Sequence, residues 1–265
     1  MKKKILHIIT SLSGGGAQSV LFRLVSTSKK NGSNFNHEIL NLSKEGFYEK
    51  KFTDIGIKVT NIGIPRGKFS FHYLLKIIKF LRKNDYDLVQ TWMYHADFLG
   101  GVLARIFTKK KVLWNIRSSN LSFKLNRWHT VLIAKICSFL SFFVPSIIIA
   151  NSNRAITYHK KFGYSKKKFN LIFNGFDSLN LIKNDDKRQK LRLKFNIDHK
   201  DFVIGNIARW DPQKDHKNLL ESISKIQNKK NLKLFLLGEN INYQNHSLIE
   251  LINKYGIKKE NIILH

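Results

Sequence analysis

The feature that most constrains the fold of this chain is the alternation of short apolar runs with longer amphipathic stretches. Strands that alternate with helices form parallel sheets with right-handed crossovers, so the pattern predicts an α/β protein with an open, doubly wound parallel sheet. The expected strands are Lys4–Thr10, His37–Leu42, Lys58–Ile62, Asp87–Thr91, Lys111–Ile116, Ser146–Ala150 and Phe169–Phe173. The expected helices are 17–30, 47–55, 70–83, 96–107, 126–143 and 153–162.

The alternation is interrupted once and then resumes. A turn signal at Asn174-Gly175 precedes the charged segment Lys183–Lys194, so we expect a linker near residues 175–185. The later strands are expected at Phe202–Ile207, Lys233–Leu237 and Asn261–Leu264, with helices at His216–Gln227 and Tyr243–Lys254. We therefore expect two α/β domains, residues 1–180 and 181–265. The second stops within its third strand, so we expect it to be incomplete and the chain to be part of a longer protein; a compact small domain is the alternative.

The charge of the chain predicts attraction to polyanions but no specific nucleic-acid partner. It has 47 Lys and Arg against 18 Asp and Glu, a net charge of +29. Lys outnumbers Arg by 37 to 10, whereas proteins that read bases depend on the planar guanidinium of Arg. An anionic membrane is therefore as good a partner as a nucleic acid. The single cysteine, Cys137, excludes an intramolecular disulfide and indicates a cytoplasmic location.

One segment, Val131–Ala150, is long enough to cross a membrane. It contains Lys135 and Pro145, and its apolar pattern changes from helical spacing to β-branched residues, so we expect a core helix followed by a strand. Basic and aromatic residues are mixed in Phe71–Lys83 and Ser122–Lys135. Such segments suit a lipid headgroup boundary, and equally an ordinary surface helix with a buried apolar stripe.

Three consecutive glycines, Gly14, Gly15 and Gly16, lie between the first expected strand and its helix. Glycine lets the backbone approach a ligand, and a helix N-terminus presents free N–H groups to an anion. The spacing is not that of the dinucleotide-binding fingerprint. The loop is therefore a candidate contact for a phosphate or sugar, with a simple tight turn as the alternative.

Further polar residues follow other strands, at the edge where α/β sheets bind ligands. Arg209 and Lys214 follow the strand at 202–207 and carry the charge needed to neutralise a diphosphate, unless they belong to a solvated basic loop. His95, Asp97 and Arg117 follow the fourth and fifth strands. Spacing alone assigns no general acid or base. The sequence shows no cluster of metal ligands, so we expect no metal.

The ordered set of motifs resembles family 4 of the retaining glycosyltransferases with the GT-B fold. The matching segments are Gly14–Ala17, Gln90–Asp97, Ile149–Ser152, Phe173–Asp177 and Gly205–Lys214, which together span nearly the whole chain. The resemblance implies two Rossmann-like domains facing each other across a cleft. The N-terminal domain would receive the acceptor and the C-terminal domain a nucleotide-diphosphate sugar, with no cofactor and no obligatory metal.

The resemblance also implies roles for individual residues. Arg209 and Lys214 would be the catalytic pair that binds the donor diphosphate as it leaves. Gly14, Gly15 and Gly16 would face this pair across the cleft and bind the donor from the opposite domain. Gly238 and Glu239 would lie near the nucleotide base, and His95, Asp97 and Arg117 on the acceptor side. Two departures stand out: many relatives have a histidine where this chain has Arg117, and none of its seven Glu residues form the family's pair eight positions apart. We expect that pair beyond residue 265.

These observations predict a hexosyltransferase of cell-surface polysaccharide synthesis that uses a nucleotide sugar and a saccharide acceptor, itself lipid-linked. It would bind peripherally to the cytoplasmic face of the membrane, and without the missing segment this chain would be weakly active or inactive. A non-hydrolysing sugar-nucleotide epimerase and a non-enzymatic basic module that binds polyanions or membranes are the alternatives.

Overall fold

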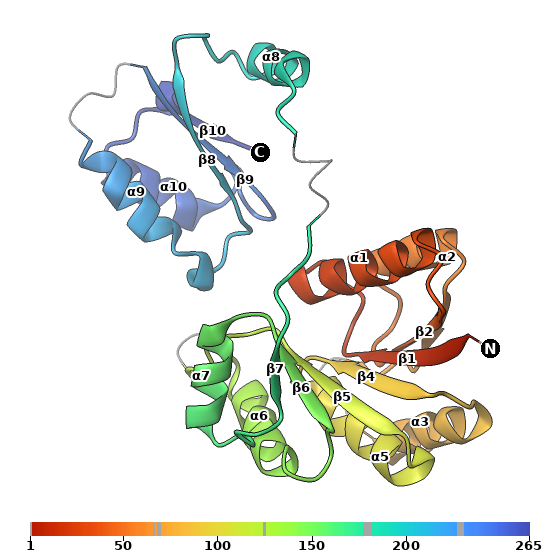
Figure 1. The fold of residues 1–265 in the computed structure, drawn as a ribbon. Helices are drawn as coiled ribbons and strands as arrows, with labels where there is room; N and C mark the ends of the chain where they lie inside the picture. The colour runs from red at the N-terminus through yellow and green to blue at the C-terminus, as the bar shows by residue number, and fades with distance from the viewer. Residues whose placement is uncertain (1, 66, 68–69, 124–125, 177–181, 227–230) are drawn as a thin grey trace. The chain divides into compact units, whose positions relative to one another are not determined.

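The computed structural model describes residues 2–265 except 66, 68–69, 124–125, 177–181 and 227–230. The chain divides into two compact units, Met1–Asp177 (unit 1) and Ser178–His265 (unit 2), and each is described by itself. In both units the strands are parallel and joined by helices, as Figure 1 shows. The α/β class predicted from the alternating pattern is confirmed.

Unit 1 contains a seven-stranded sheet with the order β3-β2-β1-β4-β5-β6-β7. Successive strands run outward from β1 to β3 on one side and from β4 to β7 on the other, so the order reverses between β1 and β4. In open α/β sheets, ligands bind at the carboxyl ends of the strands beside such a reversal. The strands are β1 (Lys3–Ile9), β2 (Phe35–Asn41), β3 (Lys58–Asn61), β4 (Leu88–Trp92), β5 (Lys111–Ile116), β6 (Ile147–Ala150) and β7 (Phe169–Leu171).

Helices cover both faces of this sheet, which explains why its strands lack polar alternation. One core lies beneath α1 and α2 and includes Leu21 and Phe52; the other lies beneath α3, α5 and α6 and includes Ile77 and Ala134. The helices are α1 (Gly16–Lys30), α2 (Phe47–Asp54), α3 (Phe71–Lys83), α5 (Val102–Thr108), α6 (Trp128–Leu140) and α7 (Asn153–Phe162). Segment 131–150 forms α6 and β6, as expected. In the part of the chain that is described, no helix is both long and apolar enough to span a membrane.

The helix expected at 96–107 is instead three pieces: α4 (Tyr94–Ala96), a π-helical turn η1 (Asp97–Gly101) and α5. Two glycines allow this turn to lie directly on the sheet. A Cβ on Gly100 would be 2.6 Å from Ile8 Cγ2, and one on Gly101 would be 2.7 Å from Trp114 Nε1. Apolar periodicity assumes the α-helical repeat and therefore does not detect a π-turn.

Unit 2 contains a three-stranded sheet with the order β10-β9-β8. Its core lies between the sheet and the two helices α9 and α10, and includes Leu220, Leu234 and Leu248. The elements are β8 (Phe202–Ile207), α9 (His216–Ser224), β9 (Leu232–Leu237), α10 (His246–Lys254) and β10 (Ile262–Leu264).

The charged segment at 183–194 contains a helix that the sequence interpretation missed, α8 (Asp185–Lys194). No residue of α8 is buried, so it has no apolar stripe to detect. Its N-terminal end is stabilised instead, because the side chain of Asn184 accepts a hydrogen bond from Lys187 N at 2.8 Å and acidic residues occupy the first turn.

Candidate functional site

The predicted residues of unit 1 gather at the carboxyl ends of β1, β4 and β5. The glycine loop follows β1, Trp92 ends β4, and Arg117 follows β5. β1 and β4 are the two strands between which the strand order reverses. Topology therefore brings these three segments, far apart in sequence, to one edge of the sheet.

The glycine loop is open on its outer side. A Cβ on Gly14 or Gly16 would meet nothing within 4 Å, whereas one on Gly15 would approach the side chain of Gln18. Gln18 in turn donates a hydrogen bond from Nε2 to Ser11 O at 2.9 Å, which fixes the start of the loop. The first turn of α1 contains no acidic residue and no side chain caps it. The loop thus offers backbone N–H groups and room for a ligand.

Gly46, at the start of α2, holds this loop from behind. A Cβ there would lie 2.5 Å from the carbonyl carbon of Leu12, and the neighbouring Tyr48 N donates a hydrogen bond to Leu12 O at 2.9 Å. The sequence interpretation missed Gly46 because only the tertiary fold brings it against the loop.

Arg117 is a half-buried cation with a fixed orientation. Its Nη1 donates to Asn174 Oδ1 at 2.7 Å, and its guanidinium lies over the ring of Trp92 with 4.9 Å to the centroid. Burial lowers the pKa of Arg117 to about 10, so it remains charged at neutral pH. Asn174 lies in the segment after β7, so this hydrogen bond joins the segments that follow β5 and β7.

The backbone after β4 is strained. Met93 has φ 74° and ψ 153°, a conformation normally reserved for glycine, which costs about 1–3 kcal/mol. The strained residue precedes His95, whose ring lies 6.1 Å from that of His129. Burial, and secondly His129, lower the pKa of His95, so its imidazole is neutral at pH 7. A neutral imidazole at this edge can donate or accept a hydrogen bond.

Asp97 does not lie at the surface, contrary to its predicted place on the acceptor side. It is fully buried beneath the π-turn, where Oδ1 accepts a hydrogen bond from Thr91 Oγ1. Among the described residues, Oδ2 has no hydrogen-bond partner. Burial raises the pKa of Asp97 well above its ordinary value, which favours the neutral acid. Asp97 was placed correctly after β4 from the sequence, but the Asp97 side chain points into the core instead of toward the surface.

In unit 2, Arg209 and Lys214 lie on one short segment after β8. Asp211 orients Arg209, accepting hydrogen bonds from its Nε at 3.1 Å and its Nη2 at 2.9 Å. Asp211 also accepts a hydrogen bond from Gln213 N at 2.9 Å, which starts the 3-10 turn η3 (Pro212–Lys214). That backbone N–H, followed by Arg209, lowers the pKa of Asp211. Lys214 ends the turn and is exposed. The segment thus presents two cations, one of them held in place by a carboxylate.

Gly238 joins the turn after β9 to this cationic segment. Its φ is +154°, and a Cβ there would lie 2.4 Å from Ala208 O. The hydrogen bond from Trp210 N to Glu239 O, 2.8 Å long, ties the two segments together next to Arg209. Glu239 itself is exposed. Position 238 therefore requires glycine, because the adjacent backbone of Ala208 leaves no room for a Cβ.

A shallow hollow of about 300 Å³ lies beside this junction. Trp210 forms one wall, and the rest is amide side chains, those of Asn240, Asn242, Gln244 and Asn245. Amides carry both donors and acceptors, so such a hollow suits a flat heterocycle that hydrogen-bonds along its edge. The described residues include no group of three or more His, Cys, Asp or Glu that could hold a metal ion.

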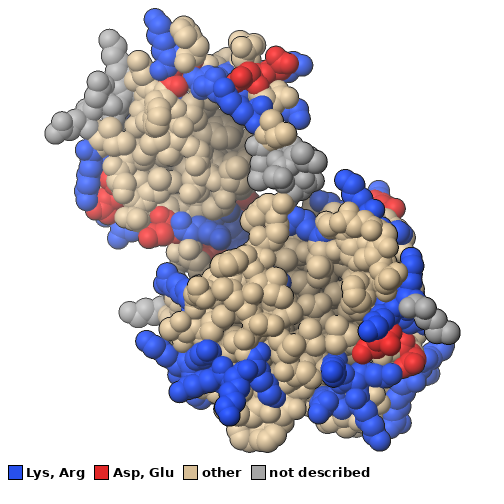
Figure 2. Space-filling model, viewed as in Figure 1, with Lys and Arg blue, Asp and Glu red and all other residues tan. Residues whose placement is uncertain are grey.

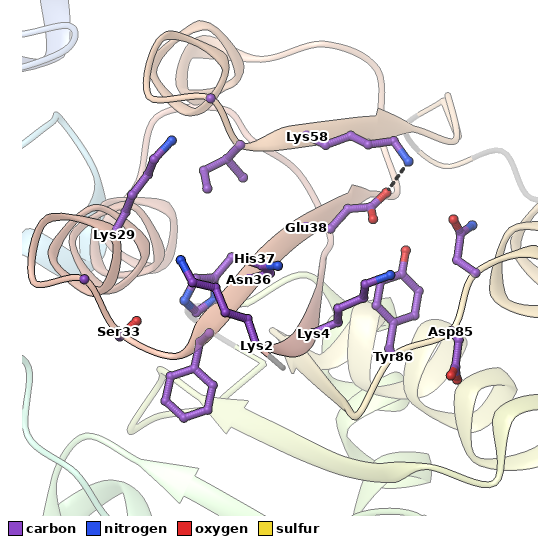
Figure 3. Close-up of a pocket in the computed structure, with 15 residues that line it drawn as sticks. Lys2, Lys4, Lys29, Ser33, Asn36, His37, Glu38, Lys58, Asp85 and Tyr86 are labelled. Carbon is purple, nitrogen blue, oxygen red and sulfur yellow. Dashed lines mark ion pairs between the residues drawn. The ribbon is translucent and has the colours of Figure 1, made fainter.

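A second hollow, of about 330 Å³, lies at the opposite edge of the unit 1 sheet, near the amino ends of β1, β2 and β3 (Figure 3). It contains none of the predicted site residues. Among its basic side chains, Lys58 pairs with Glu38 at 2.8 Å, as the dashed line in Figure 3 marks. This hollow is therefore separate from the candidate site.

A chain of hydrogen bonds runs from Trp92 to the wall of this second hollow. Trp92 Nε1 donates to His7 Nδ1 at 3.3 Å, so the neutral His7 ring donates from Nε2 to His37 Nδ1 at 2.9 Å. His37 Nε2 then donates to Ser28 Oγ at 2.7 Å. His7 is fully buried, and burial, followed by His37, lowers its pKa to about 3.

Acid should therefore destabilise unit 1 through His7. In the folded protein the pKa of His7 lies below its ordinary value of 6.5. The contribution of neutral His7 to the free energy of unfolding is therefore complete above pH 6.5 and is lost as the pH falls toward 3. Between pH 7 and pH 5 the wild type should lose about 2 kcal/mol more than His7→Gln, whose carbonyl oxygen still accepts from Trp92. Urea unfolding at both pH values measures this. His72→Gln, an exposed histidine on α3, is the control and should match the wild type; equal losses in all three proteins would contradict the assignment.

Comparison with known proteins gives the family. The family model described as Glycosyltransferase Family 4 matches residues 14–178. No curated protein sequence matches the chain.

Solved structures confirm the predicted GT-B architecture. The chain is similar to Anabaena HepE in complex with UDP-glucose, with a TM-score of 0.80 and 19% identity over 98% of this chain and 67% of HepE. For a glycosyltransferase from Rickettsia africae ESF-5, the TM-score is 0.70 and the identity 18%, over 99% of this chain and 67% of that protein. For a putative UDP-N-acetylglucosamine 2-epimerase from Listeria monocytogenes, the TM-score is 0.59 and the identity 13%, over 100% of this chain and 69% of that protein. The chain thus spans about two thirds of the length of these proteins, and at these identities the likeness shows the fold alone.

Proposed function

Because the chain belongs to glycosyltransferase family 4, we propose that it takes part in the transfer of a hexose from a nucleotide-diphosphate sugar to a saccharide acceptor. The observation that carries this proposal is the pair of cations after β8, with Arg209 oriented by Asp211. HepE, which has the same fold, is described with UDP-glucose, which supports a uridine nucleotide as the first donor to test.

In the proposed reaction, the bond between the anomeric carbon and the diphosphate oxygen breaks, and its electron pair leaves with the nucleoside diphosphate. The acceptor hydroxyl oxygen bonds to the anomeric carbon, and its proton passes to the departing phosphate oxygen. Negative charge on the diphosphate grows during this step, so preorganised cations that bind it lower the barrier. Arg209 and Lys214 are the proposed cations, and the amide-lined hollow beside Trp210 is the proposed base site.

The acceptor side is proposed for unit 1. His95 offers a neutral imidazole and Arg117 a fixed cation at the carboxyl edge of the sheet. Asp97 is left out because it is fully buried. We further propose a lipid-linked saccharide acceptor in cell-surface polysaccharide synthesis. That Arg209 and Lys214 face the glycine loop across a cleft stays a prediction.

The proposal is tested by nucleotide-sugar binding, since binding requires no knowledge of the acceptor. Calorimetric titration with UDP-glucose, and with UDP alone, should show Arg209→Ala and Lys214→Ala each binding at least about tenfold more weakly, because each removes a charge-assisted hydrogen bond. The matched controls are Arg188→Ala and Lys254→Ala, two exposed cations on α8 and α10. They should bind as the wild type does. No binding by the wild type to any nucleotide sugar would refute the proposal.

The same experiment separates the transferase from a basic polyanion-binding module. For such a module, all four substitutions would weaken binding by similar small amounts, and binding would fall steeply with salt. The sugar-nucleotide epimerase is a second candidate because the Listeria protein shares the fold. An epimerase would convert the sugar nucleotide without any acceptor, which analysis of the products reveals.

A further inference from the structure

Helix α6 is apolar on both faces, although only one face packs into the core. The buried residues are Val131, Ala134, Cys137 and Ser138, and Ser138 Oγ donates a hydrogen bond to Lys135 O within the helix. On the outward face, Trp128 is 69% exposed, Leu132 51% and Phe139 67%. Ile136 completes this row, and the spacing places all four on one side of the helix. A surface helix normally turns charged or polar side chains outward, so this face calls for an explanation.

The apolar face continues beyond the end of α6. Phe143 is 64% exposed, and Phe142 beside it is also exposed. The ring of Phe143 lies 5.7 Å from that of Phe139 and 6.5 Å from that of Phe142, so the aromatic rings are contiguous. We call the six residues Trp128, Leu132, Ile136, Phe139, Phe142 and Phe143 the aromatic stripe.

Helix α3, the other segment that mixes basic and aromatic residues, has a different surface. Its buried residues are Ile77 and Leu81, and its exposed side includes Lys76, Lys79 and Arg82. Phe71 and Leu75 are its only exposed large apolar residues. Helix α3 is thus an ordinary amphipathic helix, whereas α6 is not.

The sequence segment that contains the aromatic stripe carries charged residues of one sign only. From residue 98 to residue 176 the sequence contains fourteen Lys and Arg and no Asp or Glu. Lys168 contacts the stripe directly, since its Nζ donates to Phe142 O at 2.6 Å, and burial followed by Arg105 lowers its pKa. Lys135 lies in α6 itself. Figure 2 shows Lys and Arg on either side of uncharged surface at the end of unit 1 where Figure 1 places α5, α6 and α7.

We propose that the aromatic stripe docks unit 1 on the surface of an anionic lipid bilayer. Apolar rings enter the headgroup boundary while the surrounding cations bind anionic headgroups. The thirteen residues of α6 are about 20 Å long, so the helix lies in the plane of the interface and does not cross it. This inference deepens the proposed function and rests on it only in that a lipid-linked acceptor lies at a membrane.

Charge argues against a second copy of the chain as the occupant. A symmetric dimer through the stripe would bring two segments together that each carry fourteen cations and no acid. An anionic bilayer supplies the opposite charge and an apolar layer beneath it. The cations near the stripe complement the anionic headgroups, and its apolar rings suit the layer beneath them.

The test is binding to vesicles of phosphatidylcholine with and without phosphatidylglycerol, measured by co-sedimentation. The wild type should bind the anionic vesicles at least about tenfold more tightly than the neutral ones, and less tightly as salt is added. Phe139→Ser/Phe143→Ser should weaken this binding at least about tenfold. Phe71→Ser is the matched control, because Phe71 is 70% exposed on α3, and it should bind as the wild type does.

A second readout reports on the stripe itself. Trp128 emission should shift to the blue when anionic vesicles are added, and Trp128→Phe should abolish the shift. Equal binding by the double variant and the wild type would overturn the proposal, as would an equal loss in Phe71→Ser. So would a wild-type dimer that the double variant converts to a monomer. The double variant should bind UDP-glucose normally and Arg209→Ala should bind vesicles normally, so failure of either proposal is recognised separately.

Discussion

Gly238→Ala should destabilise unit 2 by about 3 kcal/mol or more. Two effects add: the φ of +154° is unfavourable for any residue with a Cβ, and that Cβ would lie 2.4 Å from the backbone oxygen of Ala208. Backbone cannot yield as a flexible side chain does. The substitution should also move the segment that carries Arg209 and so weaken UDP-glucose binding.

The measurement is denaturant unfolding combined with hydrogen exchange of peptides from β8 and β9. Gly205→Ala is the matched control, because Gly205 lies in β8 and a Cβ there would meet nothing within 4 Å. It should change stability by less than about 1 kcal/mol. If Gly238→Ala exchanges no faster than Gly205→Ala, the close approach to Ala208 is wrong.

Gly46→Ala should destabilise unit 1 by about 2–3 kcal/mol. Its φ of −154° is extended backbone that alanine also adopts, so the effect is steric alone. The new Cβ would lie 2.5 Å from the carbonyl carbon of Leu12 and would push the start of the glycine loop away from α2.

Gly14→Ala serves as its control, since a Cβ on Gly14 would meet nothing within 4 Å. Urea unfolding should give Gly46→Ala a clearly lower free energy of unfolding than the wild type. Gly14→Ala should have the same free energy of unfolding as the wild type. Exchange should accelerate in peptides that cover residues 10–20 and 46–52 of Gly46→Ala only. Coincident unfolding curves for the two variants would show that Gly46 does not support the loop.

Much of the fold could be predicted because strand and helix formation depend on local patterns. The apolar runs that become β1, β5 and β6 and the amphipathic stretches between them are visible within short windows of sequence. Parallel strands joined by helices have few topologies, so the sheet followed from the order of elements. Helix α8 was not predicted because it has no apolar stripe; its sequence signals are an N-cap residue and charges at its ends.

The candidate site was predicted only as far as strand ends reveal it. Arg209 and Arg117 lie after strands, as expected, but nothing local shows that Asp211 and Asn174 hold them. Asp97 illustrates the limit: its position after β4 was predicted, yet the π-turn that follows directs its side chain into the core. Gly46 and Gly238 owe their importance to backbone that lies far away in sequence.

The sequence by itself determined the α/β class, the order of strands and helices, and the segments that end at the ligand-binding edge. These follow from short-range periodicity, which acts before any distant contact forms. Only the tertiary structure decided which side of α6 stays exposed, that Asp97 is buried, and which glycines meet neighbouring backbone. Burial depends on what distant segments cover, and a helix that is apolar on both faces carries no local mark of the face that will meet the core.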